Sequence, residues 1–331
     1  MTDKLRVLQY GLGPIGSAVA RHVLERPGLE LVGAVDVDPL KAGKDAGEVI
    51  GLGRALGLPV MARLSQVLEH TSADVVLHTT SSYFDRFKPQ ILEILNAGLD
   101  VVSTAEELSF PWLAHAEDAA EIDALARRVT KSVLATGINP GFLMDTLPLQ
   151  LTALCQRVER IEVRRAQNAS KRRGPFQAKI GSGMTVEEFQ AKMAAGRMGH
   201  VGLPESVGMV MSTLGKKLVR YEAEIEPVVA ERLIRTEFFE VPPGKVAGLR
   251  QVARGYSEEG LFITLTFVAA LDWGEDCDTI AIKGKPDLEV VLKGTNGDIG
   301  TVAIVVNAIR RVREAPPGLL TMRDLPIVTF G

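Results

Sequence analysis

Two adjacent carboxylates, Glu106 and Glu107, are the side chains of this sequence best suited to acid–base chemistry. They follow an apolar segment that ends at Ser103, and the apolar residues 110–112 come shortly after them. A carboxyl beside apolar side chains can exchange a proton near neutral pH, as a general acid or base must. The alternative is that one or both are exposed acids in a first helical turn, where the helix dipole favours negative charge. The local sequence leaves both interpretations open.

A glycine pattern near the start of the chain predicts a dinucleotide site. An apolar segment, residues 5–10, leads into the pattern, and apolar residues at helical spacing follow it. In such a unit the first glycine permits a tight turn, the second lets the backbone approach a pyrophosphate, and the third lets helix and strand pack closely. The N–H groups at the start of the helix attract the phosphates. The cofactor-binding candidates here are Gly11, Leu12, Gly13, Pro14, Ile15 and Gly16.

Asp36 stands at the end of the second apolar segment, residues 29–35, and completes this pattern. A carboxylate at this place accepts hydrogen bonds from the adenosine ribose and repels a 2′-phosphate, which favours NAD over NADP as the cofactor. The nearby basic side chains Lys41 and Lys44 keep NADP as an alternative, since a cation could hold the extra phosphate.

Hydroxyl side chains gather after two further predicted strands. Thr79 ends one predicted strand, Thr80 and Ser81 follow it, and Thr104 follows the next strand. Ligands of open α/β sheets lie beyond the carboxyl ends of the strands, so we expect these hydroxyls to line the nicotinamide side of the cofactor site. The alternative is that they cap the helices that follow. His78 lies within its strand and is expected to be a buried core residue.

The substrate-pocket candidates follow the last strand of the first domain or lie in a glycine-rich loop of the second. They are Asn139, Pro140, Phe142, Met144 and His200. The alternatives are a hinge at the Asn-Pro-Gly turn, core positions for the apolar side chains, and a surface histidine. Apolar walls favour a small aliphatic substrate. A carboxylate-bearing substrate stays open because Arg164, Arg165, Arg172 and Arg173 could provide a clamp.

The order of predicted elements indicates the fold that positions these residues. Strands are expected at residues 5–10, 29–35, 75–79, 101–103 and 132–136, with helices at 14–25, 64–70, 86–96 and 113–129. Alternating strands and helices form a parallel sheet with right-handed crossovers. We therefore predict an α/β protein whose first domain, residues 1–141, is a Rossmann-type, doubly wound parallel sheet.

Beyond residue 141 the pattern changes to alternating polar and apolar residues, which is typical of antiparallel strands with one exposed face. Examples are residues 160–164, 219–225, 261–267 and 288–292. We predict an α+β domain, residues 142–299, that binds substrate and dimerises through an open, mainly antiparallel sheet. The apolar helix and tail, about residues 300–331, are expected to pack back on the first domain. The exposed sheet face predicts a homodimer.

Composition narrows the class of protein. The chain has 331 residues, of which 46% are hydrophobic and 24% charged, and its formal net charge is −3. This balance argues against a nucleic-acid partner, which would require a basic surface. No apolar segment is long enough to span a membrane. Cys155 and Cys277 lack metal-ligand spacing, so no metal is expected. The first strand begins directly after Lys4, so a cytoplasmic location is expected.

Five segments carry a family resemblance. They are Gly11 to Gly16, Gly33 to Pro39, Val101 to Leu108, Gly137 to Phe142, and His200 to Ser206. Together they resemble the 2,4-diaminopentanoate dehydrogenase and native amine dehydrogenase family, which lies within the dihydrodipicolinate reductase-like superfamily. The resemblance covers most of the chain, and its most specific parts are the paired glutamates and the Asn-Pro-Gly-Phe segment.

The resemblance implies reversible, NAD(P)-dependent oxidative deamination of a small amine or diamine to a ketone or aldehyde and ammonia. In the reductive direction a hydride is transferred to an iminium carbon. The family's catalytic glutamate falls on the pair, where Glu106 is favoured and Glu107 is the second choice. The resemblance also implies that Asn139, Pro140, Phe142 and Met144 are wall positions of a pocket between the domains.

Three alternatives stay open. A reductase resembling dihydrodipicolinate reductase would share the fold, but its His-His-Lys-type signature is not found. A homoserine dehydrogenase-like enzyme would use a catalytic lysine that has no match here. A nonenzymatic NAD-sensing protein would bind the cofactor without turnover.

Overall fold

A computed structural model describes residues 4–196 and 198–330. The chain forms two compact units. Unit 1 comprises the described residues up to Phe142 together with those from Asn296 onward, and unit 2 runs from Leu143 to Thr295.

Unit 1 is built on a seven-stranded sheet with the order β15-β6-β5-β4-β1-β2-β3. The strands are β1 (Leu5–Tyr10), β2 (Leu29–Val35), β3 (Val60–Met61), β4 (Val75–His78), β5 (Asp100–Ser103), β6 (Ser132–Ala135) and β15 (Gly318–Leu320). All neighbouring pairs are parallel. The sheet confirms the predicted Rossmann-type fold, and its order brings the ends of β1, β2, β4 and β5 to one edge.

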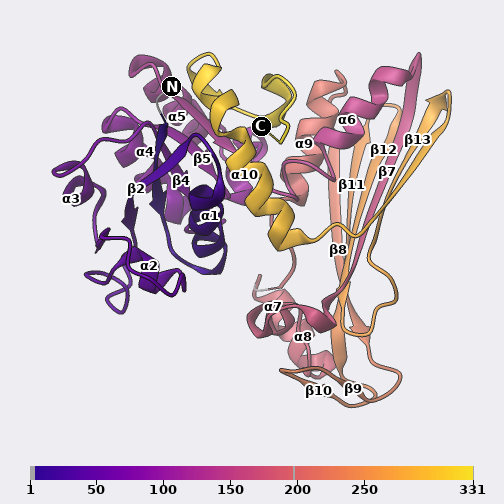
Figure 1. Cartoon of the computed structure of the whole chain (residues 1–331). Coiled ribbons are helices and arrows are strands. Elements are labelled where there is room, and N and C mark those ends of the chain that lie inside the picture. Colours follow the sequence, from indigo (N-terminus) through magenta and orange to yellow (C-terminus); the bar gives the residue numbers. More distant parts are fainter. Residues whose placement is uncertain (1–3, 197, 331) are drawn as a thin grey trace. The chain divides into compact units, whose positions relative to one another are not determined.

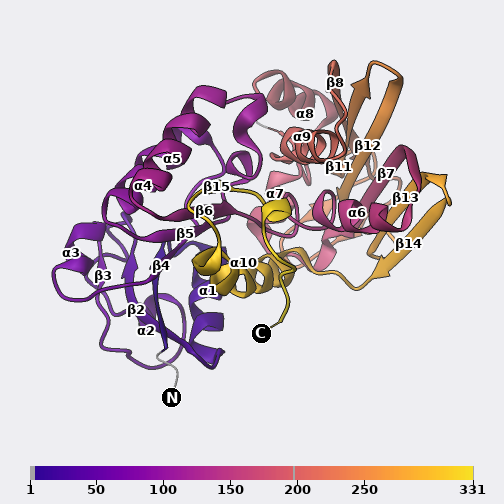
Figure 2. The same cartoon turned by 90° about the horizontal axis from the view of Figure 1, so that it is seen from above.

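Helices cover both faces of this sheet (Figure 2). One face packs against α1 (Pro14–Glu25) and α10 (Gly297–Glu314), and the other against α4 (Phe84–Asn96) and α5 (Ala116–Arg128). Strands buried on both faces are uniformly apolar, as β4 and β5 are. Shorter helical elements of unit 1 are α2 (Ala46–Val49), α3 (Leu64–Leu68), η1 (Glu106–Leu108), η2 (Pro111–Leu113) and η5 (Met322–Asp324).

An ion pair to a buried carboxylate fixes α10 to the sheet. Nη1 of Arg313 donates to Oδ2 of Asp100 at 2.7 Å, and the other oxygen of this buried carboxylate accepts from the backbone N–H of Ser132 at 2.7 Å. The carboxylate therefore joins the start of β5, the start of β6 and the C-terminal helix.

Unit 2 is built on a six-stranded mixed sheet with the order β14-β13-β7-β12-β11-β8 (Figure 1). Its strands are β7 (Arg157–Asn168), β8 (Arg220–Val229), β11 (Val246–Ser257), β12 (Gly260–Ala270), β13 (Cys277–Lys285) and β14 (Leu288–Lys293). Neighbouring strands are antiparallel, except that β7 and β12 are parallel. The predicted open sheet is thus confirmed as a mixed one.

Helices cover one face of this second sheet (Figure 1). The helical elements of unit 2 are α6 (Thr146–Leu151), η3 (Thr152–Leu154), η4 (Ala169–Lys171), α7 (Gly174–Lys179), α8 (Val186–Ala194) and α9 (Leu203–Thr213). A two-stranded sheet is formed by β9 (Ile234–Arg235) and β10 (Glu240–Val241). The opposite face carries cross-strand ion pairs, including Arg254 with Glu224 at 2.6 Å and Arg250 with Glu226 at 3.1 Å.

Candidate cofactor and active site

The glycine loop after β1 has the geometry that a pyrophosphate site requires. Gly11 has φ +94°, a left-handed conformation that favours glycine. A Cβ on Gly16 would overlap the carbonyl oxygen of Gly11, so strand and helix approach closely only because both are glycines. A Cβ on Gly13, by contrast, would meet nothing within 4 Å. Gly13 caps α1, and Pro14 begins the helix. The protein itself therefore leaves open space beside Gly13, where a phosphate can approach the helix N-terminus.

Asp36 lies directly beyond β2 and is tied to this loop. Its Oδ2 accepts from the backbone N–H of Leu12 at 2.7 Å and from Nζ of Lys41 at 2.9 Å. Its Oδ1 accepts from the backbone N–H of Asp38 at 2.9 Å. Burial tends to raise the pKa of Asp36, but these donors outweigh it and hold the pKa below the usual value. The carboxylate is therefore charged near neutral pH, as binding to ribose hydroxyls requires.

The side chain of Thr79 supports the glycine loop from β4. Its hydroxyl donates to the carbonyl oxygen of Gly11 at 2.9 Å and accepts from Nε2 of Gln9 at 2.7 Å. Gln9 also donates to the Gly11 carbonyl at 2.8 Å. Sequence reasoning did not single out Gln9. The signal that could have found it is a polar residue in an otherwise apolar buried strand, since such a residue needs a specific partner.

His78 is fully buried, and burial lowers its pKa to about 4. Its Nδ1 lies 2.9 Å from the hydroxyl of Ser103, and its Nε2 lies 2.8 Å from Oε1 of Gln90. The expectation of a core histidine is confirmed. The hydroxyl of the exposed Thr80 joins the same network, at 2.9 Å from Nε2 of His78.

The remaining strand-end hydroxyls lie at the same sheet edge. Ser81 accepts from the backbone N–H of Tyr83 at 3.2 Å, just before α4. The backbone N–H of Thr104 donates to the carbonyl of His78 at 3.0 Å, so the ends of β4 and β5 are joined there. The Ser81 contact lies in the turn before α4 and does not reach an N–H of the helix itself. Thr104 is half-buried.

The geometry of η1 separates the two glutamates. A 3₁₀-helix has about three residues per turn, so successive side chains point about 120° apart. Leu108 is fully buried in the core beneath α4 and α5. Glu107 points to the N-terminus of α4, where its Oε2 accepts from the backbone N–H of Phe84 at 2.6 Å. Glu106 therefore points in the third direction, away from both.

The surroundings of Glu107 give it a structural role. Its carboxylate caps α4, where the helix dipole stabilises negative charge. Nε2 of His115 lies 3.5 Å from the same oxygen, and the His115 ring stacks on Phe84 at 4.4 Å between centroids. Glu106 is half-buried, and its backbone carbonyl accepts from the hydroxyl of Ser109 at 2.8 Å.

The turn after β6 carries three of the predicted pocket residues. A Cβ on Gly141, whose φ is +122°, would approach the hydroxyl oxygen of Thr136 to 2.6 Å, so only glycine suits this position. Asn139 is buried in the turn and is joined to Pro140 by a cis peptide. Phe142 packs against the core between the sheet and α10. These residues lie in unit 1, at the carboxyl end of β6.

The other two predicted pocket residues lie in unit 2. Met144 is fully buried. His200 is half-buried, its backbone N–H donates to Oε1 of Gln251 at 2.7 Å, and its ring packs against Phe267 at 5.0 Å between centroids. A small cavity of about 20 Å³ adjoins the His200 ring. It is lined by Phe176, Lys179, Ile180, Gly199, His200, Leu249 and Phe267.

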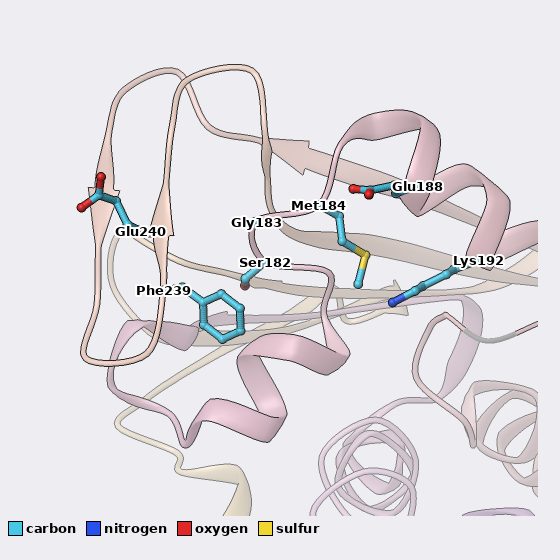
Figure 3. Close-up of a pocket in the computed structure, with 7 residues that line it drawn as sticks. All are labelled: Ser182, Gly183, Met184, Glu188, Lys192, Phe239 and Glu240. Carbon is cyan, nitrogen blue, oxygen red and sulfur yellow. The ribbon is translucent and has the colours of Figure 1, made fainter.

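A second cavity of unit 2, of about 440 Å³, lies between α8 and the strand β10 (Figure 3). Its acidic residues serve local roles, because Glu188 accepts from the backbone N–H of Thr185 at 2.7 Å and Glu240 pairs with Arg235 at 3.0 Å. Glu240 points away from the cavity in Figure 3. The predicted site residues do not line it.

In residues 4–196 and 198–330, no group of three or more His, Cys, Asp or Glu side chains could hold a metal ion. No helix of that same part of the chain is both long and apolar enough to cross a membrane.

Comparison with known proteins identifies the family. Residues 142–330 match the 2,4-diaminopentanoate dehydrogenase C-terminal domain, and residues 5–102 match the N-terminus of dihydrodipicolinate reductase. A 2,4-diaminopentanoate dehydrogenase from Acetoanaerobium sticklandii is 32% identical, over 98% of this chain and 94% of that protein. The chain belongs to the 2,4-diaminopentanoate dehydrogenase family. The predicted resemblance is thereby confirmed.

Two further relatives place this family member among the NAD-binding oxidoreductases. An amine dehydrogenase from Streptomyces virginiae is 25% identical, over 96% of this chain and 95% of that protein. The solved structure of an amine dehydrogenase from Mycobacterium smegmatis superposes with a TM-score of 0.89 at 25% identity, covering 100% of this chain and 98% of that one. The relatives of this chain thus include a 2,4-diaminopentanoate dehydrogenase and two amine dehydrogenases.

Proposed function

We propose that this protein is an NAD(P)-dependent amine dehydrogenase. In the oxidative direction, a protonated amine, oxidised cofactor and water would give a ketone or aldehyde, reduced cofactor, ammonium and a proton. The observation that carries the proposal is the arrangement of η1, which commits Glu107 to the N-terminus of α4 and directs Glu106 elsewhere at the cofactor edge of the sheet. Family membership supports the same chemistry.

The residues of unit 1 fit a nicotinamide dinucleotide. The space beside Gly13 and the N-terminus of α1 suit the pyrophosphate, and the charged carboxylate of Asp36 suits the adenosine ribose. Thr80 and Thr104 stay candidates for the nicotinamide side. The bound cofactor would supply hydride acceptance or donation, and NADP remains the alternative to NAD because Lys41 lies beside Asp36.

Glu106 would handle the protons of the reaction. As a carboxylate it would accept a proton from the substrate ammonium and release that proton to solvent. The regenerated carboxylate would favour a cationic iminium through its negative charge. It would then take a proton from the water that attacks the iminium and return it to the departing nitrogen. A carboxylate suits this chemistry better than ketone reduction, in which a developing alkoxide requires a proton donor.

The substrate in this proposal is a small amine or diamine, and Asn139, Pro140, Phe142, Met144 and His200 are its proposed wall residues. We further propose a cytoplasmic homodimer. The alternating Arg and Glu side chains on the sheet face opposite α9 support the dimer, because a second copy in antiparallel orientation could complement them. Light scattering would test the dimer, which a mass of one chain would exclude.

The decisive experiment follows NADH absorbance with a panel of small ketones and aldehydes, with and without ammonium. We expect oxidation only when ammonium is present, and loss of it in Glu106→Gln with NADH binding retained. Oxidation without ammonium would instead point to an alcohol dehydrogenase or a ring reductase of the dihydrodipicolinate type. NADH binding without oxidation of any substrate, diamines and amino acids included, would indicate the nonenzymatic NAD sensor.

A further inference from the structure

A buried imidazole in unit 1 is hydrogen-bonded through both of its ring nitrogens. His78 is fully buried at the end of β4. Its Nε2 lies 2.8 Å from Oε1 of Gln90 on α4 and 2.9 Å from the hydroxyl of the exposed Thr80. Its Nδ1 lies 2.9 Å from the hydroxyl of Ser103, which accepts from the backbone N–H of Ala105 at 3.0 Å. The ring therefore joins a surface hydroxyl to the turn that leads into η1.

The charge state of His78 decides the direction of these hydrogen bonds. Burial lowers its pKa to about 4, so near neutral pH the ring is neutral and has one N–H donor and one acceptor. The carbonyl oxygen of Gln90 can only accept, so the N–H of the ring is at Nε2. Nδ1 is then the acceptor, and the hydroxyl of Ser103 donates to it. The partners of the ring thus fix its tautomer.

The same carbonyl oxygen fixes the hydroxyl of Thr80. Oγ1 of Thr80 donates to Oε1 of Gln90 at 2.6 Å and faces the Nε2–H group of His78 at 2.9 Å. A hydroxyl has one hydrogen and two lone pairs, so the hydrogen and one lone pair of Thr80 are engaged by the protein. One lone pair is left. Thr80 can therefore accept a hydrogen bond from a ligand, but its hydrogen is already donated to Gln90.

Thr80 lies where the nicotinamide half of a dinucleotide is expected. A Cβ on Gly11 would approach the methyl carbon of Thr80 to 3.0 Å, so Thr80 adjoins the glycine loop. The strand order of the sheet reverses between β1 and β4, and dinucleotides bind across such a point. Asp36, after β2, suits the adenosine on one side of it. Thr80, after β4, is on the other side.

The chemistry of that half indicates which group meets an acceptor. The donors of a nicotinamide riboside are its ribose hydroxyls and the N–H₂ of its carboxamide. A ribose hydroxyl can rotate either to donate or to accept, so it gains little from a partner of fixed direction. The carboxamide nitrogen can only donate. An acceptor that cannot become a donor therefore distinguishes the nitrogen of the carboxamide from its oxygen.

We propose that His78 and Gln90 are positioning residues that hold the Thr80 hydroxyl as an acceptor for the carboxamide N–H₂ of the nicotinamide. A hydroxyl free to rotate could bind either the nitrogen or the oxygen of that group. A hydroxyl that only accepts selects the nitrogen and so favours one orientation of the carboxamide. Ser103 holds the other edge of the imidazole, which keeps the ring from turning. The inference rests on the cofactor of the proposed function and is independent of which amine is oxidised.

The test compares two dinucleotides that differ only at this group. NAD has a carboxamide, whereas 3-acetylpyridine adenine dinucleotide has a methyl ketone, in which CH₃ replaces NH₂. Isothermal titration calorimetry without any amine measures the Kd of each oxidised dinucleotide, so no turnover takes place. Thr80→Val removes the acceptor, and Thr80→Ser keeps it as the matched control. If NADP binds more tightly than NAD, NADP and its acetylpyridine analogue replace the pair.

Three variants test the positioning residues. The side-chain amide of His78→Gln can take the place of Nε2 and keep the bonds toward Gln90 and Thr80. The shorter amide of His78→Asn can take only the place of Nδ1, beside Ser103. Gln90→Met removes the oxygen to which Thr80 donates. Thermal unfolding verifies that each variant is folded, and a purely structural role of these residues would change Tm without changing the preference between the two dinucleotides.

We expect the wild type to bind NAD more tightly than the acetyl analogue. Thr80→Val should weaken NAD binding about 2- to 12-fold, the range for one neutral hydrogen bond, and change binding of the analogue less than about twofold. Thr80→Ser and His78→Gln should keep most of the preference for NAD, and His78→Asn and Gln90→Met should lose it.

Equal weakening of both dinucleotides in Thr80→Val would overturn this inference alone, as would an unchanged preference in folded His78→Asn and Gln90→Met. The expected pattern of Kd values without ammonium-dependent NADH oxidation would support this inference and overturn the proposed function. A wild type that bound neither NAD nor NADP would overturn both.

Discussion

Replacing the two glutamates of η1 separately should give opposite results for stability and activity. Glu107→Ala removes the acceptor that caps α4, with its 2.6 Å bond from the backbone N–H of Phe84. Loss of such a cap costs about 0.5–2 kcal/mol, and loss of the charge near a helix N-terminus costs about 0.3–1 kcal/mol more. His115 adds little, because a partly exposed pair of this kind is worth about 0–1 kcal/mol.

The expected total for Glu107→Ala is therefore about 2 kcal/mol. For a unit of this size, each kcal/mol lowers Tm by about 2–4 °C, so the transition of unit 1 should fall by about 4–8 °C. Glu107→Gln keeps an oxygen that can accept from Phe84 and should lose less than half of this. Glu106→Gln should leave Tm within about 1 °C and lower kcat by about 10²–10⁴-fold, the usual contribution of a general acid or base.

Differential scanning fluorimetry and ammonium-dependent NADH oxidation would measure the two effects on the same preparations. If Glu107 caps α4 and Glu106 transfers protons, the two effects separate. A Glu107→Ala protein of unchanged Tm that had lost turnover, or a Glu106→Gln protein that kept wild-type kcat, would refute these roles.

Three further outcomes follow from unit 1. Gly13→Ala should weaken NAD binding in a fluorescence titration and leave Tm unchanged, because its Cβ meets no protein atom. Gly16→Ala should weaken NAD binding and also lower Tm, because its Cβ would overlap the Gly11 carbonyl. Equal losses of Tm in the two variants would contradict this. Burial lowers the pKa of His78 from 6.5 to about 4, so the neutral ring stabilises the folded state fully above about pH 6.5. The free energy of unfolding should fall by on the order of 3 kcal/mol as the pH drops from there to about 4. In urea unfolding, His78→Gln should lack this pH dependence. Asp36→Ser should raise the NADP/NAD ratio of kcat/KM at least about tenfold by releasing Lys41, and Asp36→Ser/Lys41→Met should remove the gain.

The sequence predicts the first sheet well because the signals there are local. The helix expected at residues 14–25 begins after the glycine turn at Pro14 and is observed as Pro14–Glu25. The strands β1 and β2 likewise have their expected bounds. Each of these elements is defined by neighbours in the chain, namely an apolar run, a turn glycine and a helix-starting proline.

Two strands of the six-stranded sheet, β11 and β13, were not predicted, and β11 shows why. Gly248 and Gly255 interrupt its apolar pattern in a way that normally marks a break. In the structure each glycine makes room for a neighbour. A Cβ on Gly248 would overlap the backbone of Ala269 on β12, and one on Gly255 would approach Val207 of α9 to 2.6 Å. These requirements come from partners distant in the sequence, so no local pattern contains them.

The same distinction applies to the candidate site. The glycine loop and Asp36 lie in one continuous stretch and could be located directly. The choice between Glu106 and Glu107 depends on Phe84, more than twenty residues earlier in the chain. Arg165 likewise lies 3.8 Å from the carboxylate of Asp278, a residue more than a hundred positions later. Residue types identified these groups as candidates, but only the strand order brings each to its partner.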